Sequence, residues 1–454
     1  MSHTHHTKES ASYRWKTEVL PQLPSDLEQQ AKLLGAFQRH REFASAASLL
    51  RGLLAYALVS SSLAHLAAWG VLSDVADICA AAWLRRLRAA RPWLSWLLGV
   101  ILAGAPAGWL AAPGRQRVKL IDATVVHPIG STAQGWRLQL SYDLIAGHFS
   151  ELVLLDIGQG EALGLMKLEP GDIAVVDSGY GRRVHLAAAV SQGADVVMRV
   201  YLPSCPLQDR QGKPLDLLPQ LERRGRVALE LPALVEHKGQ QHQVRVLAVP
   251  LPPDQAAMAR RRLQRTGKRK GRTPSNTSLT LATWVILVTT LSAAAWPAPE
   301  VVALYRARWQ VEVAFKRLKQ LLRVARLRCR SEESAKALLT LYLLGWALSS
   351  ELVGELRPAL QRAATAAPST LPGQWPEQEA VVSTWRLCQL SLEVLRGQVW
   401  GSWTAERLRE CIPKLVRHLV THPRQDGRCH QETVIRARLT GQRLTPPRPQ
   451  QDAE

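Results

Sequence analysis

Two aspartates each close a run of apolar residues that is typical of a buried strand. Asp122 ends the run VKLID, and Asp177 ends the run IAVVD. A carboxylate in this position is held rigidly while its oxygens face an open edge, and oxygen ligands are those that Mg²⁺ prefers. An aspartate at the end of a strand is more often an ordinary turn residue. The pair is therefore a candidate cation site that other residues have to support.

A third feature is a strongly basic stretch, residues 305–330, with a single carboxylate. It contains nine Arg or Lys side chains, and its one acid is Glu312. Such an acid could merely relieve charge repulsion, but its neighbours at helical spacing favour a site. At about 100° per residue, one face of the predicted helix carries Tyr305, Arg308, Glu312 and Lys319. Over about 21 Å this face combines one metal ligand with a guanidinium and an ammonium that suit phosphates.

The charge of the chain points to a polyanionic partner. Its 58 Lys and Arg against 37 Asp and Glu give a formal charge of +21. Nucleic acid or an anionic membrane would fit such a charge. The excess is uneven, because residues 114–200 are net −1 while residues 201–299 and 300–454 are each net +9. The two aspartates thus lie in a mildly acidic segment beside strongly basic ones.

The elements that must position these residues form an α/β core between helical regions. Strands are predicted at residues 118–122, 136–142, 151–155, 173–177 and 194–201, with a helix at 180–192 before the last. The predicted organisation is a helical N-terminal DNA-binding region (1–113), the first part of the core (114–201), a β-rich insertion with a basic loop (202–299), a core helix that carries Glu312 (300–345), a helical C-terminal region (346–440) and a disordered tail (441–454).

The N-terminal region shows helical periodicity in leucines 49, 50, 53, 54 and 58. Ser73 is the predicted N-cap of a helix that ends at Pro92, with four arginines near its C-terminal end. The basic end of this bundle could lie on a DNA backbone or form a solvated surface, and this segment alone favours neither.

Residues 94–112 carry no charge and are long enough to span a bilayer. Gly99, Gly104, Pro106 and Gly108 favour a break, so we expect a buried connector. No apolar signal follows the N-terminus, and the six cysteines are scattered without a CxxC pair. We therefore expect a reducing compartment, the bacterial cytoplasm, with the protein associated with the nucleoid.

A second basic run, residues 260–272, holds eight positive charges and no acid. We expect a loop that lies against phosphate groups when DNA is bound; a solvated loop is the alternative. The expected contacts to DNA come from Arg260, Arg261, Arg262, Lys268, Arg269 and Lys270.

Together these residues resemble the IS4-type DDE transposases of bacterial insertion sequences. The family signature Tyr-x2-Arg-x3-Glu-x6-Lys is matched at every spacing by Tyr305, Arg308, Glu312 and Lys319. Asp122 in DATVV is similar to the first catalytic aspartate of the family, and Asp177 in DSGYG to the second. Ser178 replaces the usual arginine, and Thr290 stands where an asparagine is common. The resemblance covers about residues 45–350.

The resemblance implies an RNase H-like core interrupted by a β-rich insertion. It implies two Mg²⁺ ions, for which Mn²⁺ can substitute, bound by Asp122, Asp177 and Glu312 with Asp122 bridging them. One ion would activate the attacking water or 3′-hydroxyl and the other would stabilise the leaving oxygen. The implied partners are DNA, as terminal inverted repeats and as target, and a second copy of the chain on paired ends. No membrane partner is expected.

Two tryptophans are further candidates for contact with DNA. In similar transposases, aromatic residues near these places hold a base that has flipped out of the duplex. Trp284 lies at the end of the insertion, and Trp309 directly follows Arg308. Packing in the core is the alternative for both.

Other function classes remain open on the sequence. A catalytically inactive or domesticated DNA-binding relic would keep the charge but needs no intact set of three acids. A nuclease that does not join strands would use the same metal chemistry. A membrane protein built on residues 94–112 would leave the spread of positive charge unexplained.

Overall fold

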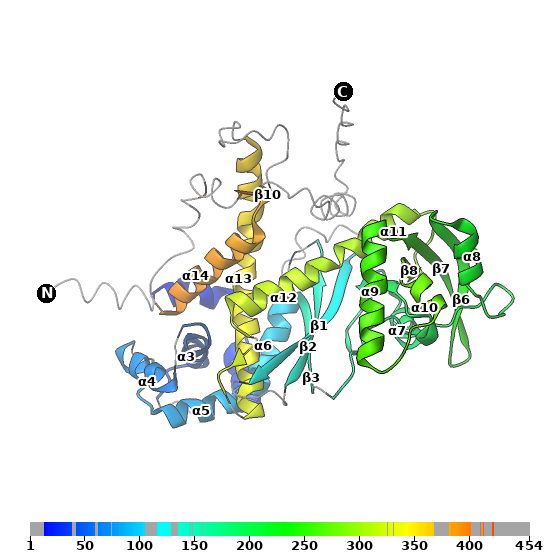
Figure 1. Ribbon diagram of the computed structural model, residues 1–454. Helices are drawn as coiled ribbons and strands as arrows, with labels where there is room; N and C mark the ends of the chain where they lie inside the picture. Colours follow the sequence, from blue (N-terminus) through cyan, green and yellow to red (C-terminus); the bar gives the residue numbers. More distant parts are fainter. Residues whose placement is uncertain are drawn as a thin grey trace.

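The computed structural model describes most of the chain up to residue 421. The described residues are 13–38, 42–59, 62–73, 75–104, 116–128, 135–145, 147, 149–156, 158–324, 326–329, 331–366, 381–400, 409, 412 and 420–421. The tail predicted at residues 441–454 lies outside them. In Figure 1 the blue N-terminal helices lie at one end of the molecule, and the green segment lies at the other end beyond the central strands.

The N-terminal part is helical wherever it is described. Its elements are η1 (Trp15–Val19), η2 (Leu20–Gln22), α2 (Leu27–Leu33), α3 (Ala46–Leu58), α4 (Leu63–Leu72), α5 (Ala80–Ala89) and α6 (Arg91–Gly104). The side chains of Ser45 and Ser62 cap α3 and α4 by accepting backbone N–H bonds. Helix α6 covers the described part of the uncharged stretch, and it buries Leu94, Leu97 and Leu98 in the core. The remainder of that stretch, residues 105–112, lies outside the described chain.

The predicted boundaries around α5 are wrong. Ser73 is not an N-cap: it follows the end of α4, and its N–H donates to the Trp69 carbonyl. The chain then turns, and α5 begins only after Cys79. Pro92 does not end this helix but lies in the first turn of α6, where the missing N–H of proline costs no helical hydrogen bond.

A single mixed sheet forms the centre of the molecule. Its strands are β1 (Val118–Pro128), β2 (Trp136–Asp143), β3 (Phe149–Asp156), β4 (Ile173–Val176), β5 (Asp195–Arg199), β6 (Leu229–His237), β7 (Gln240–Pro250), β8 (Trp284–Thr289) and β9 (Arg326–Leu327). The order is β3-β2-β1-β4-β5-β8-β7-β6, and β9 pairs with β1 outside that order. Strands β1 to β3 are antiparallel, whereas β4 runs parallel to β1 and β5 parallel to β4. All five strands predicted before residue 202 are present, so the α/β class is confirmed.

Residues 202–299 extend this sheet by three strands. They also form the short 3₁₀ helix η4 (Leu202–Ser204) and three α-helices. The hairpin β6–β7 turns at Lys238 and Gly239, both with positive φ. Strand β8 lies between this hairpin and β5, and it pairs antiparallel with both β7 and β5. The helices are α8 (Leu218–Arg224), α9 (Pro253–Arg269) and α10 (Asn276–Leu281). The basic run was predicted as a loop, and this is wrong: most of it lies in α9. Its Ala, Gln, Met, Lys and Arg residues are strong helix formers, which outweighed the charge repulsion.

The two faces of the sheet pack against different hydrophobic clusters. Along β1, Leu120 belongs to the first cluster and the next residue, Ile121, to the second. Strand β4 alternates in the same way, as a strand with both faces covered must. Helix α7 (Arg183–Val190) covers the second cluster together with η3 (Leu163–Leu165). The N-terminal helices and the helices after β8 belong to the first cluster.

The C-terminal half supplies α11 (Ala298–Ala307), α12 (Trp309–Leu321), α13 (Glu332–Ala366) and α14 (Thr384–Trp400), with the short strands β10 (Val381–Val382) and β11 (Val420–Thr421). The core helix predicted over residues 300–345 is not a single helix: it divides at Arg308, α12 ends at Leu321, and β9 (Arg326–Leu327) stands between α12 and α13. Helix α13 runs through the predicted boundary at residues 345/346. Its span Glu332–Ala364 is long and apolar enough to cross a membrane, but 83% of the apolar window is buried in the protein.

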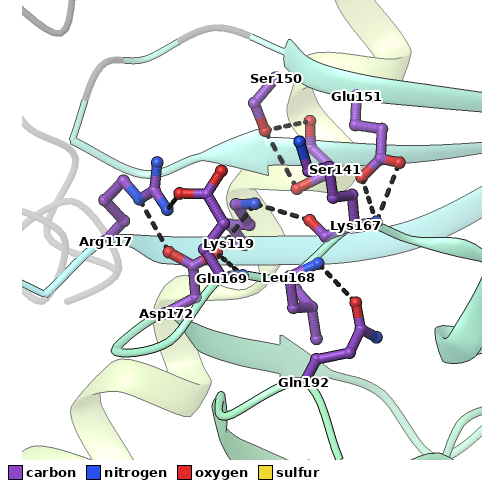
Figure 2. Close-up of polar contacts among 10 residues, drawn as sticks. All are labelled: Arg117, Lys119, Ser141, Ser150, Glu151, Lys167, Leu168, Glu169, Asp172 and Gln192. Atoms are coloured by element: carbon purple, nitrogen blue, oxygen red, sulfur yellow. Dashed lines mark hydrogen bonds and ion pairs between the residues drawn. The ribbon is translucent and has the colours of Figure 1, made fainter. Parts of the chain in front are cut away.

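A polar network sets the register between β1 and β4 (Figure 2). Asp172 is almost fully buried, and its two oxygens contact Arg117 Nε at 2.8 Å and Lys119 Nζ at 2.9 Å. The carbonyl of Arg117 accepts from Ile173 N at 2.8 Å. These bonds fix the start of β4 beside the start of β1. The same register determines which residues meet at the other ends of the two strands.

Candidate active site

Asp122 and Asp177 lie side by side at the end of the paired stretch of β1 and β4 that is farther from the polar network. Ile121 pairs with Val176 in the parallel ladder, so an aspartate follows each of these two residues. Asp177 follows the end of β4 as predicted, but Asp122 does not end its strand, because β1 continues to Pro128 with Asp122 paired to Leu140 of β2. Asp122 accepts a hydrogen bond from Ala123 N at 2.8 Å, and Asp177 accepts one from Gly179 N at 2.7 Å. The predicted juxtaposition of the two aspartates is therefore present in the fold.

The surroundings of Asp122 disfavour its negative charge. Burial raises the pKa of Asp122 to about 6, and the charges of Asp177 and Glu161 add to this effect. The Ala123 N–H and the Arg308 guanidinium act in the opposite direction. A carboxylate with this balance gains from any additional cation placed beside it.

Arg308 joins the first aspartate to the third predicted acid. Its Nη1 lies 3.4 Å from Asp122 Oδ2, and its Nη2 lies 2.5 Å from Glu312 Oε1. Arg308 stands at the junction of α11 and α12, and Glu312 lies in the first turn of α12, which packs on β1. The side chains of Arg308 and Asp122 are 15% and 17% exposed, whereas that of Glu312 is 56% exposed. The guanidinium thus occupies the space between two of the three acids.

This arrangement is not closed around a metal. Among the described residues, no three acidic, histidine or cysteine side chains stand close enough together to hold an ion as they lie. Glu312 turns toward Arg308, and Arg308 supplies the positive charge beside Asp122. The oxygens of the three acids are nevertheless the ligand type that Mg²⁺ and Mn²⁺ take.

The other residues of the basic motif lie on both helices. Tyr305 lies in α11, three residues before Arg308; burial raises the pKa of its phenol, and the charge of Arg308 opposes this effect. Lys319 lies in the last turn of α12, and burial lowers the pKa of its ammonium. A one-residue turn at Arg308 divides the predicted helix, although Arg308 itself keeps helical backbone angles (φ −50°, ψ −34°). The charge of Arg308 nonetheless acts on Tyr305, and its guanidinium contacts Glu312 directly.

The two tryptophans have different environments. Trp284 is 5% exposed and packs in the second hydrophobic cluster, where it pairs with Pro250 of β7. This is the core-packing alternative, because an indole held there is not open to a base. Trp309 is partly exposed at the start of α12, directly beside Arg308.

Helix α9 presents its cations to solvent. Only Ala256 of this helix is buried. The six predicted DNA contacts are all exposed, and none has an ion-pair partner in the part of the chain that the structure describes: Arg260, Arg261, Arg262, Lys268, Arg269 and Lys270. Five of them lie within α9, and Lys270 is its C-cap.

One acid at the site was missed from the sequence. Glu161 precedes η3 in the connection from β3 to β4, and Arg137 Nε of β2 lies 3.5 Å from its Oε1. Burial raises the pKa of Glu161; the charge of Arg137 opposes this and that of Asp177 adds to it. Its local sequence, GQGEALG, resembles an ordinary loop. No spacing rule relates it to the aspartates, so only the fold places it there.

Comparisons with known proteins show which family the chain resembles. The family model described as Transposase DDE domain matches residues 156–348, which include Asp177 and Glu312. A protein of Escherichia coli (strain K12) named as an InsL transposase for insertion sequence element IS186A is 33% identical over 337 residues, 73% of this chain and 91% of that protein. The transposase for IS421 of Escherichia coli is 33% identical over 338 residues with the same shares. The transposase for IS231E of Bacillus thuringiensis subsp. finitimus is 27% identical over 247 residues, 46% of this chain and 50% of that protein. The chain belongs to the IS4-type DDE transposases of bacterial insertion sequences.

Proposed function

We propose that this transposase cuts the ends of its insertion sequence and joins them to target DNA by metal-dependent phosphoryl transfer at Asp122, Asp177 and Glu312. The observation that carries the proposal is the parallel register of β1 and β4, which sets two aspartates side by side. Arg308 connects this pair to Glu312 through two ion pairs. The three acids reach the site from two strands and a helix, each of which is anchored in the core.

The three carboxylates would hold the divalent ions, two Mg²⁺ for which Mn²⁺ can substitute. The donor set suits such ions, because all three acids offer oxygen and the charge of Asp177 disfavours that of Asp122. When bound, divalent ions of this kind activate an attacking hydroxyl and stabilise a leaving oxygen. Asp122 would be one of the ligands that hold these ions. The guanidinium of Arg308 has to leave Asp122 before an ion can take its position.

Topology supports an RNase H-like core interrupted by an insertion. The run β3-β2-β1-β4-β5, with three antiparallel strands followed by two parallel ones, is the order expected of that core. Strands β6 and β7 follow β5 in the chain and extend the sheet at the edge beyond β8. We take residues 202–299 as the insertion, which carries the basic helix α9 between β7 and β8.

DNA contact is proposed for two groups of residues. Arg308, Tyr305, Lys319 and Trp309 lie along α11 and α12 beside the acids, where a forked guanidinium suits a phosphate. The exposed cations of α9 form a second surface for the backbone of the terminal repeats or of the target. We further propose that the protein works in the cytoplasm as a homodimer on paired ends, because both ends have to be joined to one target.

The relic and nuclease alternatives differ in their tests. An inactive relic would bind the ends without cutting them. A nuclease would cut the ends but would not join a pre-cut 3′-hydroxyl to a target. The intact set Asp122, Asp177 and Glu312 favours activity over the relic.

The test uses the full chain with DNA that carries the element's own ends. Glu312→Gln keeps the size of the side chain and removes its charge, so we expect Mg²⁺-dependent cleavage to be lost while end binding persists. Glu222→Gln, an exposed acid on α8, is the matched control and should cut normally. Cleavage by Glu312→Gln at the wild-type rate would remove this acid from the site. Failure of the wild-type protein to join pre-cut ends would favour the nuclease.

A further inference from the structure

We propose that Arg199 binds a phosphate of the DNA strand at the active site, on the side of Asp177 that faces away from Asp122. The inference rests on the proposed function and adds a residue that the family signature does not include. It is carried by the register of β5, by the face of the sheet to which Arg199 belongs and by the lack of a partner for its guanidinium within the described chain.

Strand β5 continues the row of residues that leads to the two aspartates. Val176 of β4 pairs with Ile121 of β1 on one side and with Met198 of β5 on the other. Arg199 follows Met198 as Asp177 follows Val176, so the two residues lie at the same edge of the sheet. Neighbouring strands lie about 4.8 Å apart. A phosphate group bound beside Asp177 is therefore within reach of the long Arg199 side chain.

The side chain of Arg199 belongs to the face of the sheet that carries α11. Along β5, Val197 packs in the first hydrophobic cluster, whereas Met198 and Val200 pack in the second. Since side chains alternate along a strand, Arg199 lies on the face of the first cluster. Tyr305 of α11 packs against this same cluster. Burial raises the pKa of Tyr305 and the positive charge of Arg199 opposes this effect, as expected of a guanidinium on the same face.

The backbone at Arg199 is held from both sides. Toward β8, Val200 N donates to the Ile286 carbonyl at 3.1 Å. Toward β4, a Cβ built on Gly181 would stand 2.4 Å from the Arg199 carbonyl oxygen. Only glycine therefore allows the loop after Asp177 to approach the end of β5 so closely. The core thus fixes the backbone of Arg199 relative to that of Asp177.

The guanidinium of Arg199 is available to a ligand. Its side chain is partly exposed and has no hydrogen bond or ion pair to the part of the chain that the structure describes. Arg308, by contrast, contacts both Asp122 and Glu312. A DNA strand that approaches these acids is repelled by their charge, so an unpaired cation at the same edge favours its phosphate. The forked guanidinium suits that contact.

The experiment measures binding of the full chain to DNA that carries the element's own ends, in EDTA so that no cleavage occurs. Arg199→Gln should weaken binding about tenfold and lower the salt dependence of binding by about one phosphate contact. Arg210→Gln is the matched control and should keep the wild-type affinity. Arg210 is exposed in the turn after Gln208, which pairs with the outer strand β6. Both variants should unfold at the wild-type temperature.

A phosphate scan tests the contact directly. Single phosphates around the cleavage position are replaced by uncharged methylphosphonates, and the affinity of each DNA is measured for the wild type and for Arg199→Gln. We expect one replacement near the cleaved bond to weaken the wild type about tenfold and to leave Arg199→Gln unchanged, because the variant has already lost that contact. If every replacement weakens both proteins equally, Arg199 binds no phosphate and the inference is overturned.

The outcomes separate this inference from the proposed function, because binding in EDTA does not depend on the metal. If the wild type cuts and joins the ends while Arg199→Gln gives the wild-type scan, only this inference fails. If the scan reveals the Arg199 contact but the wild type never cuts with Mg²⁺, the proposed chemistry fails and the contact stands. A wild type that does not bind the ends overturns both.

Should Arg199→Gln unfold, Arg199→Lys keeps the charge without the forked geometry. A smaller loss of affinity at the contacted phosphate than in the wild type supports the inference, and an equal loss overturns it.

Discussion

Arg308 offers a sharp test of how the site is arranged before metal binds. Its guanidinium contacts Asp122 at 3.4 Å and Glu312 at 2.5 Å. We predict that Arg308→Gln binds Mn²⁺ more tightly than the wild type in the absence of DNA, because the guanidinium no longer competes with the ion. The direction is informative, since loss of a residue from an active site ordinarily weakens binding of its ligands.

The magnitude follows from the burial of the two ion pairs. The contact to Glu312 is worth little, because that side chain is 56% exposed and exposed pairs contribute about 0–1 kcal/mol. The contact to Asp122 joins side chains that are 15% and 17% exposed. Breaking a fully buried pair costs about 3–5 kcal/mol, so for this longer and partly wet pair we expect about 2 kcal/mol. At about 1.4 kcal/mol per factor of ten, that corresponds to about a 30-fold gain in Mn²⁺ affinity.

The assay is calorimetric titration of Mn²⁺ into metal-free protein, with thermal unfolding in parallel. Arg308→Gln should unfold at a lower temperature than the wild type in EDTA and should be stabilised more by Mn²⁺. Arg306→Gln removes the same charge from an exposed position two residues earlier, so it corrects for the general effect of net charge. DNA ends should raise the Mn²⁺ affinity of the wild type, because a phosphate would bind the Arg308 guanidinium in place of Asp122. This coupling between DNA and Mn²⁺ should vanish in Arg308→Gln.

One result would contradict competition between the Arg308 guanidinium and Mn²⁺. If Arg308→Gln binds Mn²⁺ no more tightly than Arg306→Gln does, the guanidinium does not occupy the position of an ion. Asp122→Asn in the Arg308→Gln background then shows whether the two residues are coupled at all.

Three further predictions concern the scaffold and the DNA surface. Gly52→Ala should lower the unfolding temperature, because a Cβ there would stand 2.2 Å from the Trp83 ring and such overpacking costs about 1–3 kcal/mol; an unchanged melting curve would contradict the packing of α3 on α5. Trp284→Ala should lose about 3–5 kcal/mol of stability as a core residue. An unchanged unfolding temperature together with weaker binding of DNA ends would instead support contact between Trp284 and a flipped base. Replacing Arg261 and Lys268 of α9 by Gln should leave stability unchanged and reduce the salt dependence of DNA binding by about one per lost phosphate contact, as filter binding at several salt concentrations would show.

The sequence alone predicted the five strands before residue 202 and singled out the three acids as candidates. Most strands between residues 118 and 201 are short apolar runs between turns, a local pattern that can be recognised without a fold. Strand β1 differs, because it continues through Asp122 to Pro128 by pairing with β2. Asp122 and Asp177 follow two such runs directly. The family signature can likewise be read from the sequence, because it depends only on the spacing of Tyr305, Arg308, Glu312 and Lys319.

Helix boundaries and side-chain environments could not be obtained in the same way. The charge density of residues 260–272 predicts a loop, but their helix-forming side chains place most of them in α9. The helix predicted from residue 300 divides at Arg308 and ends at Leu321. Trp284 could have been exposed or buried, and pairing of β8 with β7 decided that it is buried.

The site itself shows most clearly what each level determines. Residue types and spacing specify which acids are present, since those are properties of neighbours along one strand or helix. Only the tertiary structure brings Glu161 from a different connection to Asp177 and sets Arg308 between Asp122 and Glu312. Contacts between elements depend on sheet register and helix packing, and these are determined by the whole core rather than by any local run of residues.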